Sequence, residues 1–373
     1  MLIVDDSPFM RLTLQKILNQ DPQIKVVDTA RDGREGIEKL RALHPQVITM
    51  DVEMPVMNGL QALDEIMRWQ PTPVIILSAV TTEGTQATMK ALDYGAFDVV
   101  AKPSGKPGAD LKNLAVDLIE KVKGAAQVDP SRLSKNGAIG RTAMKSNALN
   151  SQTQGANPAA LPNRVSTQSG VNRGGRSTAK RPKHPIEVVA IGTSTGGPSA
   201  LQTVLPQLPA NFPVPVIVAQ HMPPGFTGPL AQRLNGLCPL KVREGVHGEP
   251  LKAGTIYIAP AGKQIQVMRK NGQLFLNIGD ESPITTLYHP SVDVMFLSLA
   301  KEVGKGALGV VMTGMGNDGL KGMREIKALE GFAIAEAEET CVVYGMPRAI
   351  VDAGLADRVV PLSEIGHVIV ECV

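Results

Sequence analysis

Short apolar runs alternate with amphipathic stretches over two parts of the chain, residues 2–124 and 186–373. In the first part, the runs have the length of strands that helices cover on both faces of a parallel sheet. The predicted strands are residues 2–4, 24–27, 47–50, 74–77 and 97–100. Helical periodicity separates them, so the order predicts an α/β domain with a doubly wound parallel sheet of the flavodoxin-like type.

Two of the intervening helices carry start signals. Ser7 and Pro8 supply a cap and a first-turn proline, and Asn58 and Gly59 precede another stretch with helical periodicity. Because the first strand is short at its beginning, we expect the natural start of the protein to lie a few residues upstream of Met1.

The second part repeats the alternation of strand and helix. Its predicted strands are residues 187–191, 215–219, 255–259, 264–268, 274–278, 308–312, 331–335 and 358–360. The group 255–278 has short gaps and a turn at Asn271-Gly272, which favours a hairpin insertion. The remainder predicts a second doubly wound, Rossmann-like α/β domain over residues 186–373.

Between the two parts the pattern is lost. From Gln127 to Pro185 the chain is rich in Ser, Asn, Gln, Gly, Thr and Pro, and it carries ten Lys or Arg and one acid, Asp129. Too few apolar residues are present to offset the entropy of ordering. We therefore predict a flexible, disordered basic linker over residues 125–185. It is either a plain solvated tether or a docking or nucleic-acid arm.

Composition excludes several classes of protein. Hydrophobic residues make up 43% and charged residues 20%, and the net charge of +3 favours neither nucleic acid nor an anionic membrane as partner. The three cysteines are far apart, which is typical of a reducing compartment. We find no apolar run long enough to span a membrane and no signal peptide at the start, so we expect a cytoplasmic protein.

Polar side chains follow several strands of the first predicted sheet. Asp5 and Asp6 follow the first strand, Asp51 the third, Ser78 ends the fourth, and Lys102 follows the fifth. Ligands of such sheets bind at the carboxyl ends of the strands. A hard cation, most simply Mg²⁺, would relieve the repulsion among the carboxylates and leave one of them to act as a nucleophile toward a phosphoryl group. Lys102 and the Ser78 hydroxyl would then contact the phosphoryl oxygens.

The segments LIVDDS, MDVEMPVMNG, LSA and GAFDVVAKP together resemble a response-regulator receiver domain, here residues 1–124. The resemblance implies that Asp51 accepts the phosphoryl group. The Mg²⁺ ligands that it implies are Asp5, Asp6, Asp51 and the backbone carbonyl of Glu53. The family usually has an aromatic residue three positions before the lysine, where this chain has Val99.

In the second domain, a Gly-rich turn joins the strand EVVAI to a helical stretch. Residues 192–196 read Gly-Thr-Ser-Thr-Gly, which satisfies the G-x-S-x-G pattern of a nucleophile elbow with Ser194 at its centre. The N-terminus of the following helix offers N–H groups to a developing oxyanion. A nucleotide-binding turn is the alternative, although this one lacks the lysine of a P-loop.

Two further residues reach the same edge of the second sheet. His221 follows the strand PVIVA, and Asp318 follows the strand LGVVM in a Gly-rich loop. A lone histidine is usually structural, and a lone aspartate in such a loop is often a turn former. Together with Ser194 they supply the nucleophile, base and orienting carboxylate of a catalytic triad.

The segments GTSTGGP, QHMP, YIAP, PSVDV, MTGMGNDG and CVVYGMPRAI resemble the chemotaxis protein-glutamate methylesterase (CheB) family over nearly all of residues 187–365. The resemblance implies Ser194 as nucleophile, His221 as base and Asp318 as its orienter, with an oxyanion hole from the N–H groups of Thr195 and Met315. Where relatives often have His-Arg-Pro, this chain has Tyr-His-Pro at 288–290.

The same resemblance implies an activity and its control. The substrates would be glutamate γ-methyl esters of chemoreceptors, and receptor glutamines for deamidation, with no cofactor at the hydrolase site. The receiver would cover that site until the chemotaxis histidine kinase phosphorylates Asp51. A transcriptional regulator is the first alternative, but no helix-turn-helix appears after the linker. A nucleotide-binding module and a non-catalytic scaffold are the others.

Overall fold

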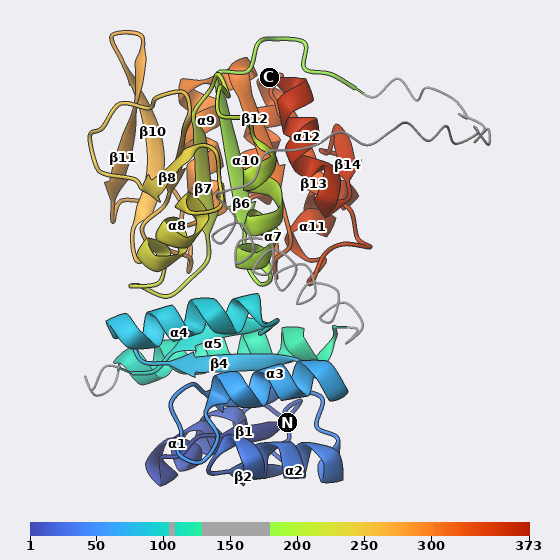
Figure 1. Ribbon diagram of the computed structural model, residues 1–373. Helices are drawn as coiled ribbons and strands as arrows, with labels where there is room; N and C mark the ends of the chain where they lie inside the picture. The colour runs from blue at the N-terminus through green and yellow to red at the C-terminus, as the bar shows by residue number, and fades with distance from the viewer. Residues whose placement is uncertain (104–108, 129–179) are drawn as a thin grey trace, which may run out of the picture.

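The chain forms two α/β domains in the computed structural model, which describes residues 1–103, 109–128 and 180–373 (Figure 1). Each domain is built on its own parallel sheet, one of five strands and one of seven within the described residues. This arrangement confirms the predicted fold class. Most of the predicted linker, residues 129–179, lies outside the described residues.

The first sheet has the order β2-β1-β3-β4-β5 and is parallel throughout. Its strands are β1 (Leu2–Val4), β2 (Asp28–Ala30), β3 (Ile48–Asp51), β4 (Val74–Ser78) and β5 (Asp98–Ala101). Its helices are α1 (Pro8–Leu18), α2 (Gly33–Leu43), α3 (Gly59–Trp69), α4 (Thr82–Asp93) and α5 (Ala109–Ala126). The predicted strand at 24–27 is wrong, because pairing with β1 begins only at Asp28, opposite Leu2.

Both predicted helix starts are confirmed. Ser7 caps α1, since its hydroxyl accepts a hydrogen bond from the N–H of Met10, and Pro8 is the first helical residue. Asn58 caps α3 in a reciprocal pair with Gln61. Each cap binds N–H groups that the first turn of a helix leaves without partners.

The second sheet has the order β14-β13-β12-β6-β7-β9-β8. Its strands are β6 (Val188–Thr193), β7 (Val216–Gln220), β8 (Lys241–Glu244), β9 (Thr255–Ile258), β12 (Ala307–Val311), β13 (Phe332–Glu336) and β14 (Arg358–Val360). The hairpin of β10 (Gln264–Lys270) and β11 (Gln273–Gly279) stands apart from it. The predicted hairpin group therefore began too early, because the wholly buried β9 belongs to the main sheet.

Helices cover both faces of the second sheet (Figure 1). They are α7 (Gly197–Val204), α8 (Thr227–Asn235), α9 (Val292–Glu302), α10 (Leu320–Ala328), α11 (Met346–Asp352) and α12 (Leu362–Cys372), with 3₁₀ turns at Leu205–Gln207 and Gly304–Gly306. None of the helices in the described ranges has the length and apolar character that crossing a membrane requires.

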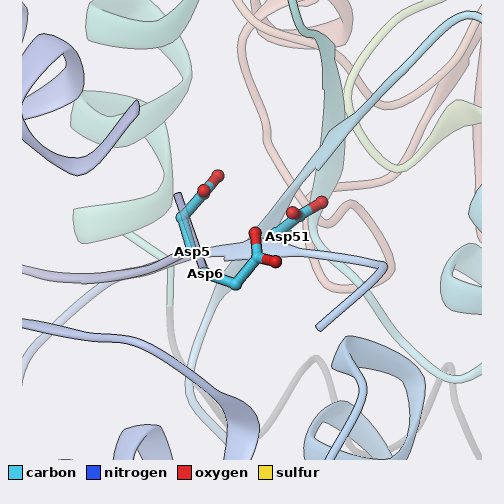
Figure 2. A group of neighbouring side chains, drawn as sticks. All are labelled: Asp5, Asp6 and Asp51. Atoms are coloured by element: carbon cyan, nitrogen blue, oxygen red, sulfur yellow. The ribbon is translucent and has the colours of Figure 1, made fainter. Parts of the chain in front are cut away.

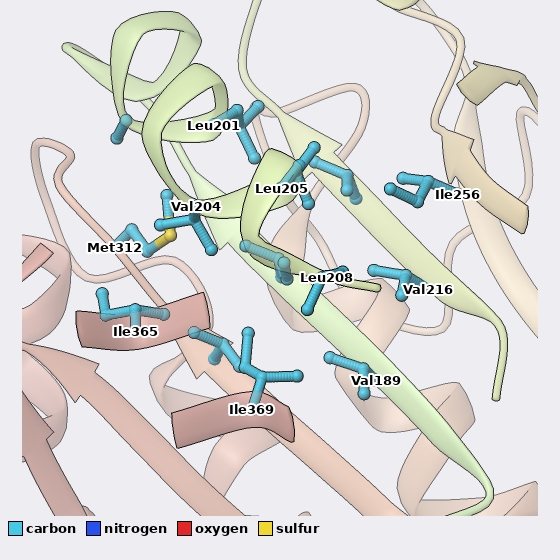
Figure 3. Close-up of a cluster of buried hydrophobic side chains, with 14 of the residues drawn as sticks. Val189, Leu201, Val204, Leu205, Leu208, Val216, Ile256, Met312, Ile365 and Ile369 are labelled. Carbon is cyan, nitrogen blue, oxygen red and sulfur yellow. The ribbon is translucent and has the colours of Figure 1, made fainter. Parts of the chain in front are cut away.

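The core beneath α7 and α12 packs these helices onto β6 (Figure 3). Leu201 and Leu205 from the α7 segment meet Ile365 and Ile369 of α12 over Val189 of β6, and all five side chains are buried. Burying a side chain of this size contributes about 1.5–3 kcal/mol. The turn between β6 and α7 is therefore held between two well-packed elements.

Candidate functional site

The register of the first sheet brings the predicted phosphorylation residues to one edge. Val4 lies opposite Met50, and Ser78 lies opposite Ala101. The residues that follow these positions, Asp5, Asp51 and Lys102, consequently leave the sheet side by side.

The three carboxylates of Asp5, Asp6 and Asp51 form one cluster (Figure 2), in which one oxygen of each lies within 4.8 Å of the others. The Lys102 ammonium lies 2.9 Å from Asp5 and 2.7 Å from Asp51. Burial raises the pKa of Asp51, and the bond to Lys102 offsets part of that effect. One ammonium leaves three acids under-neutralised, so the cluster is of the kind that holds a divalent cation.

Space for a ligand adjoins the cluster. A pocket of about 490 Å³ is lined by Asp6 and Glu53, among other residues, and is open to solvent. Ser78 is at the same edge, but its hydroxyl lies within hydrogen-bond distance of the carbonyls of Ala79 and Gly84, which share its single proton. A role of Ser78 toward a phosphoryl group therefore requires its hydroxyl to turn away from these carbonyls.

The register of the second sheet brings two of the predicted hydrolase residues to one edge of that sheet. Thr193 lies opposite Gln220, so Ser194 and His221 leave adjacent strands at one level. The N–H of Ser194 donates to the carbonyl of Thr313, the second residue after β12. Gly196 then takes a positive φ of 78° that favours glycine and lets the chain turn into α7.

Asp318 and His221 are in direct contact. Their Oδ2 and Nε2 atoms lie 2.8 Å apart, and Asp318 is 5% exposed. The carboxylate also accepts hydrogen bonds from the Ser291 hydroxyl and from the N–H groups of Val292 and Asp293, at the N-terminus of α9. Burial opposes ionisation, but the bonds from His221 and these N–H groups outweigh it and lower the pKa of Asp318.

The base nitrogen and the backbone donors that the predicted mechanism needs make no hydrogen bonds to other described residues. Nδ1 of His221 is buried and has no hydrogen-bond partner in the described part of the chain. Over the same residues, the N–H groups of Thr195 and Met315 donate to no protein acceptor. The site thus offers a basic nitrogen and two unused donors next to Ser194.

Residues of the first domain reach this site. Asp98 of β5 accepts a hydrogen bond from the Thr195 hydroxyl at 2.6 Å. On α5, Gly124 lies so close to the sulfur of Met315 that a side chain there would collide with it. Helix α4 packs against α7 and α8 (Figure 1). At this contact Asp93 pairs with Arg233 at 2.9 Å. The first domain therefore covers the rim of the hydrolase site.

Several residues around the triad were not predicted as functional. Ser291 binds Asp318, Tyr288 lies against His221, and Thr313 accepts from Ser194. The motif PSVDV contained a usable signal for Ser291, because a serine before a helical stretch is a typical N-cap. Tyr288 stands out in the sequence only as a departure from the family's His-Arg-Pro, and nothing in the pattern singles out Thr313.

Fold and site together define a two-domain protein in which an α/β domain with an acidic cluster adjoins an α/β domain with a candidate hydrolase site. Residues 1–112 match the response regulator receiver domain family, and residues 189–369 match the CheB methylesterase family. The chain belongs to the CheB methylesterase family and carries a receiver domain at its N-terminus.

Curated relatives match the chain over nearly their whole length. The chain is 72% identical to the protein-glutamate methylesterase/protein-glutamine glutaminase of Desulfitobacterium hafniense, with 100% of this chain and 97% of that protein covered. It is 43% identical to the protein of the same name from Moorella thermoacetica, with 100% and 97% covered. The crystal structure of the Thermotoga maritima CheB methylesterase catalytic domain is 41% identical and covers 51% of this chain and 100% of that one, with a TM-score of 0.49.

Proposed function

We propose that Ser194, His221 and Asp318 carry out the protein-glutamate methylesterase and protein-glutamine glutaminase activity of this receiver-regulated enzyme. His221 takes the proton of the Ser194 hydroxyl, and the serine oxygen attacks the carbonyl of a glutamyl γ-methyl ester. Methanol leaves with the proton from His221, and water then hydrolyses the acyl-enzyme to free glutamate. A glutamine side chain reacts in the same way and releases ammonia.

The observation that carries this proposal is the His221–Asp318 pair beside the Ser194 turn. Asp318 is held as a carboxylate by the N-terminus of α9, so it binds Nε2 and leaves the buried Nδ1 without a partner and able to accept the serine proton. The unused N–H groups of Thr195 and Met315 support their assignment as the oxyanion hole, which stabilises the negative oxygen of the tetrahedral intermediate.

Control by the receiver follows from the acid cluster and the domain contacts. Asp51 is the phosphoacceptor, and Asp5, Asp6, Asp51 and the Glu53 carbonyl are the ligands for Mg²⁺. The ion, when bound, neutralises the carboxylates and the incoming phosphoryl group. Lys102 follows β5 directly, and α4 and α5 are the helices on either side of that strand in the sequence. The contacts with the second domain lie on these three elements, at Asp93, Asp98 and Gly124. Phosphorylation of Asp51, next to Lys102, therefore loosens the contacts that cover the hydrolase site.

The partners follow from the same assignment. Methyl-accepting chemoreceptors are the substrates, and the chemotaxis histidine kinase is the phosphodonor. No disulfide links Cys238, Cys341 or Cys372 within the described residues, in keeping with a cytoplasmic protein. The Gly-rich turn at Ser194 serves hydrolysis in this assignment rather than nucleotide binding.

A methanol-release assay tests the proposal. The full chain is incubated with receptor membranes that carry radiolabelled methyl esters, with and without acetyl phosphate and Mg²⁺. We expect release that acetyl phosphate accelerates and that Ser194→Ala abolishes. Ser199→Ala, one turn away on α7, is the matched control and should keep the activity. Unchanged release by the Ser194 variant would remove this serine from the reaction.

A further inference from the structure

The phenol ring of Tyr288 lies flat against the imidazole of His221. The two ring centroids are 4.2 Å apart and the planes differ by 3°. Tyr288 lies in the loop between the β10–β11 hairpin and α9, far from His221 in the sequence. A parallel stack at this distance excludes water from one face of the imidazole.

A buried glutamine holds the backbone around this tyrosine. The side-chain amide of Gln264, which is 0% exposed, donates to the carbonyl of Tyr288 at 2.7 Å and accepts from the N–H of Ser291 at 2.8 Å. The hydroxyl of Ser291 in turn donates to Asp318. One clamped segment, residues 288–293, therefore contacts both His221 and Asp318.

The stack of Tyr288 on His221 restricts a rotation of the imidazole that the bond to Asp318 leaves free. The bond to Asp318 fixes only Nε2, at the tip of the imidazole, so the ring can still turn about an axis through that atom. Such a turn would swing Nδ1 away from Ser194. A flat ring packed on the imidazole blocks the rotation, and its electron-rich face also favours the imidazolium that forms when the serine loses its proton.

We propose that Tyr288 is a positioning residue, which holds the His221 ring in the plane where Nδ1 faces Ser194. The role belongs to the aromatic ring and not to the hydroxyl. It rests on the proposed function of His221 as the general base. The residue acts through His221 and does not touch the ester carbonyl.

The test compares Tyr288→Phe with Tyr288→Leu in the full chain, with acetyl phosphate and Mg²⁺ present. Phenylalanine keeps the stack, so methanol release should stay within about twofold of the unsubstituted enzyme. Leucine fills similar space without an aromatic face. It should lower kcat about tenfold with KM nearly unchanged, as expected for one misaligned catalytic group. The acid limb of the kcat/KM profile should also move to lower pH by about 0.5 unit, because a cation–π contact is lost.

The charged groups that face the stack are Asp318 and two receiver acids, Asp117 and Glu120. If Tyr288 served only the contact with the receiver, Tyr288→Leu would raise the rate measured without phosphodonor. That result would overturn the proposal, as would a leucine variant with unchanged kcat or a phenylalanine variant as slow as the leucine one.

A second readout separates this proposal from the methylesterase assignment. A fluorophosphonate probe reacts with a base-activated serine regardless of the natural substrate. We expect Tyr288→Leu to slow labelling of Ser194 about tenfold and Tyr288→Phe to leave it unchanged. Normal labelling without methanol release would contradict the methylesterase assignment, whereas equal labelling of all Tyr288 variants would contradict the positioning role.

Discussion

A buried glutamate beside the hydrolase site makes the stability of the second domain depend on pH. Glu336, the last residue of β13, is 0% exposed. Its carboxylate accepts hydrogen bonds from the N–H of Thr313 at 2.8 Å and from the Thr340 hydroxyl at 3.0 Å, and no ion pair links it to a cation within the described residues. Burial raises the pKa of Glu336 from 4.5 to about 7, and these bonds offset only part of the effect.

The sign of the effect follows from the two pKa values. The folded protein binds the Glu336 proton more tightly than the unfolded chain does. The contribution of Glu336 to stability is therefore fully present below pH 4.5 and is lost as the pH rises through 7. The shift of about 2.5 units, from 4.5 to about 7, corresponds to a loss of about 3 kcal/mol at 1.36 kcal/mol per unit.

Glu336→Gln removes this ionisation and keeps an oxygen to accept from Thr313. The free energy of unfolding of the variant, minus that of the unsubstituted protein, should therefore be about 3 kcal/mol larger at pH 8 than at pH 4.5. Urea titration of the full chain, followed by a signal of the second domain, measures the difference. Glu325→Gln, at an exposed position on α10, is the control. A difference that stays flat between these pH values would refute the reasoning.

Three further predictions concern the receiver, each checked by methanol release. Asp98→Asn should raise the rate without phosphodonor about fivefold, because a neutral acceptor for Thr195 is weaker by ~1 kcal/mol. No rise relative to Asp28→Asn, a half-buried control on β2 away from the second domain, would contradict it. Arg233→Ala should raise the same rate by a smaller factor, about twofold, since Arg233 is one third exposed; a decrease would count against the interface. Chelation by EDTA should abolish the acceleration by acetyl phosphate, as should Asp51→Asn, and persistent acceleration in either case would exclude Asp51 and its cation from the switch.

The sequence was sufficient to predict the convergence of both sites. The carboxyl ends of parallel strands meet at one edge of the sheet. An apolar run that is followed by a polar residue therefore predicts that this residue lies at that edge. Asp51, Lys102, Ser194 and His221 could each be assigned to an edge in this way. Asp318 was predicted on the same ground. Asp318 follows β12 and His221 follows β7, the two strands that flank β6, and the loop after β12 brings their side chains to 2.8 Å.

Other features could not be predicted, for physical reasons. The apolar run 24–27 is not a strand, because its backbone bonds to Met1, through Lys25 and Val27, and the register with β1 starts at Asp28. Hydrophobicity alone does not report where a strand ladder begins. The edge strand β8 reads Lys-Val-Arg-Glu and has too little apolar character to stand out. The contacts of Asp98 and Arg233 join two domains, and periodicity does not distinguish a surface that faces water from one that faces another domain.

The covalent intermediate on Ser194 is the most direct test of the central claim. The full chain, activated with acetyl phosphate and Mg²⁺, is mixed with methylated receptor, quenched in acid within the first turnover and digested for mass spectrometry. The account predicts a glutamyl ester on the peptide that contains Ser194, which hydroxylamine removes and which His221→Ala fails to form. Steady methanol release with that peptide unmodified at every quench time would contradict it.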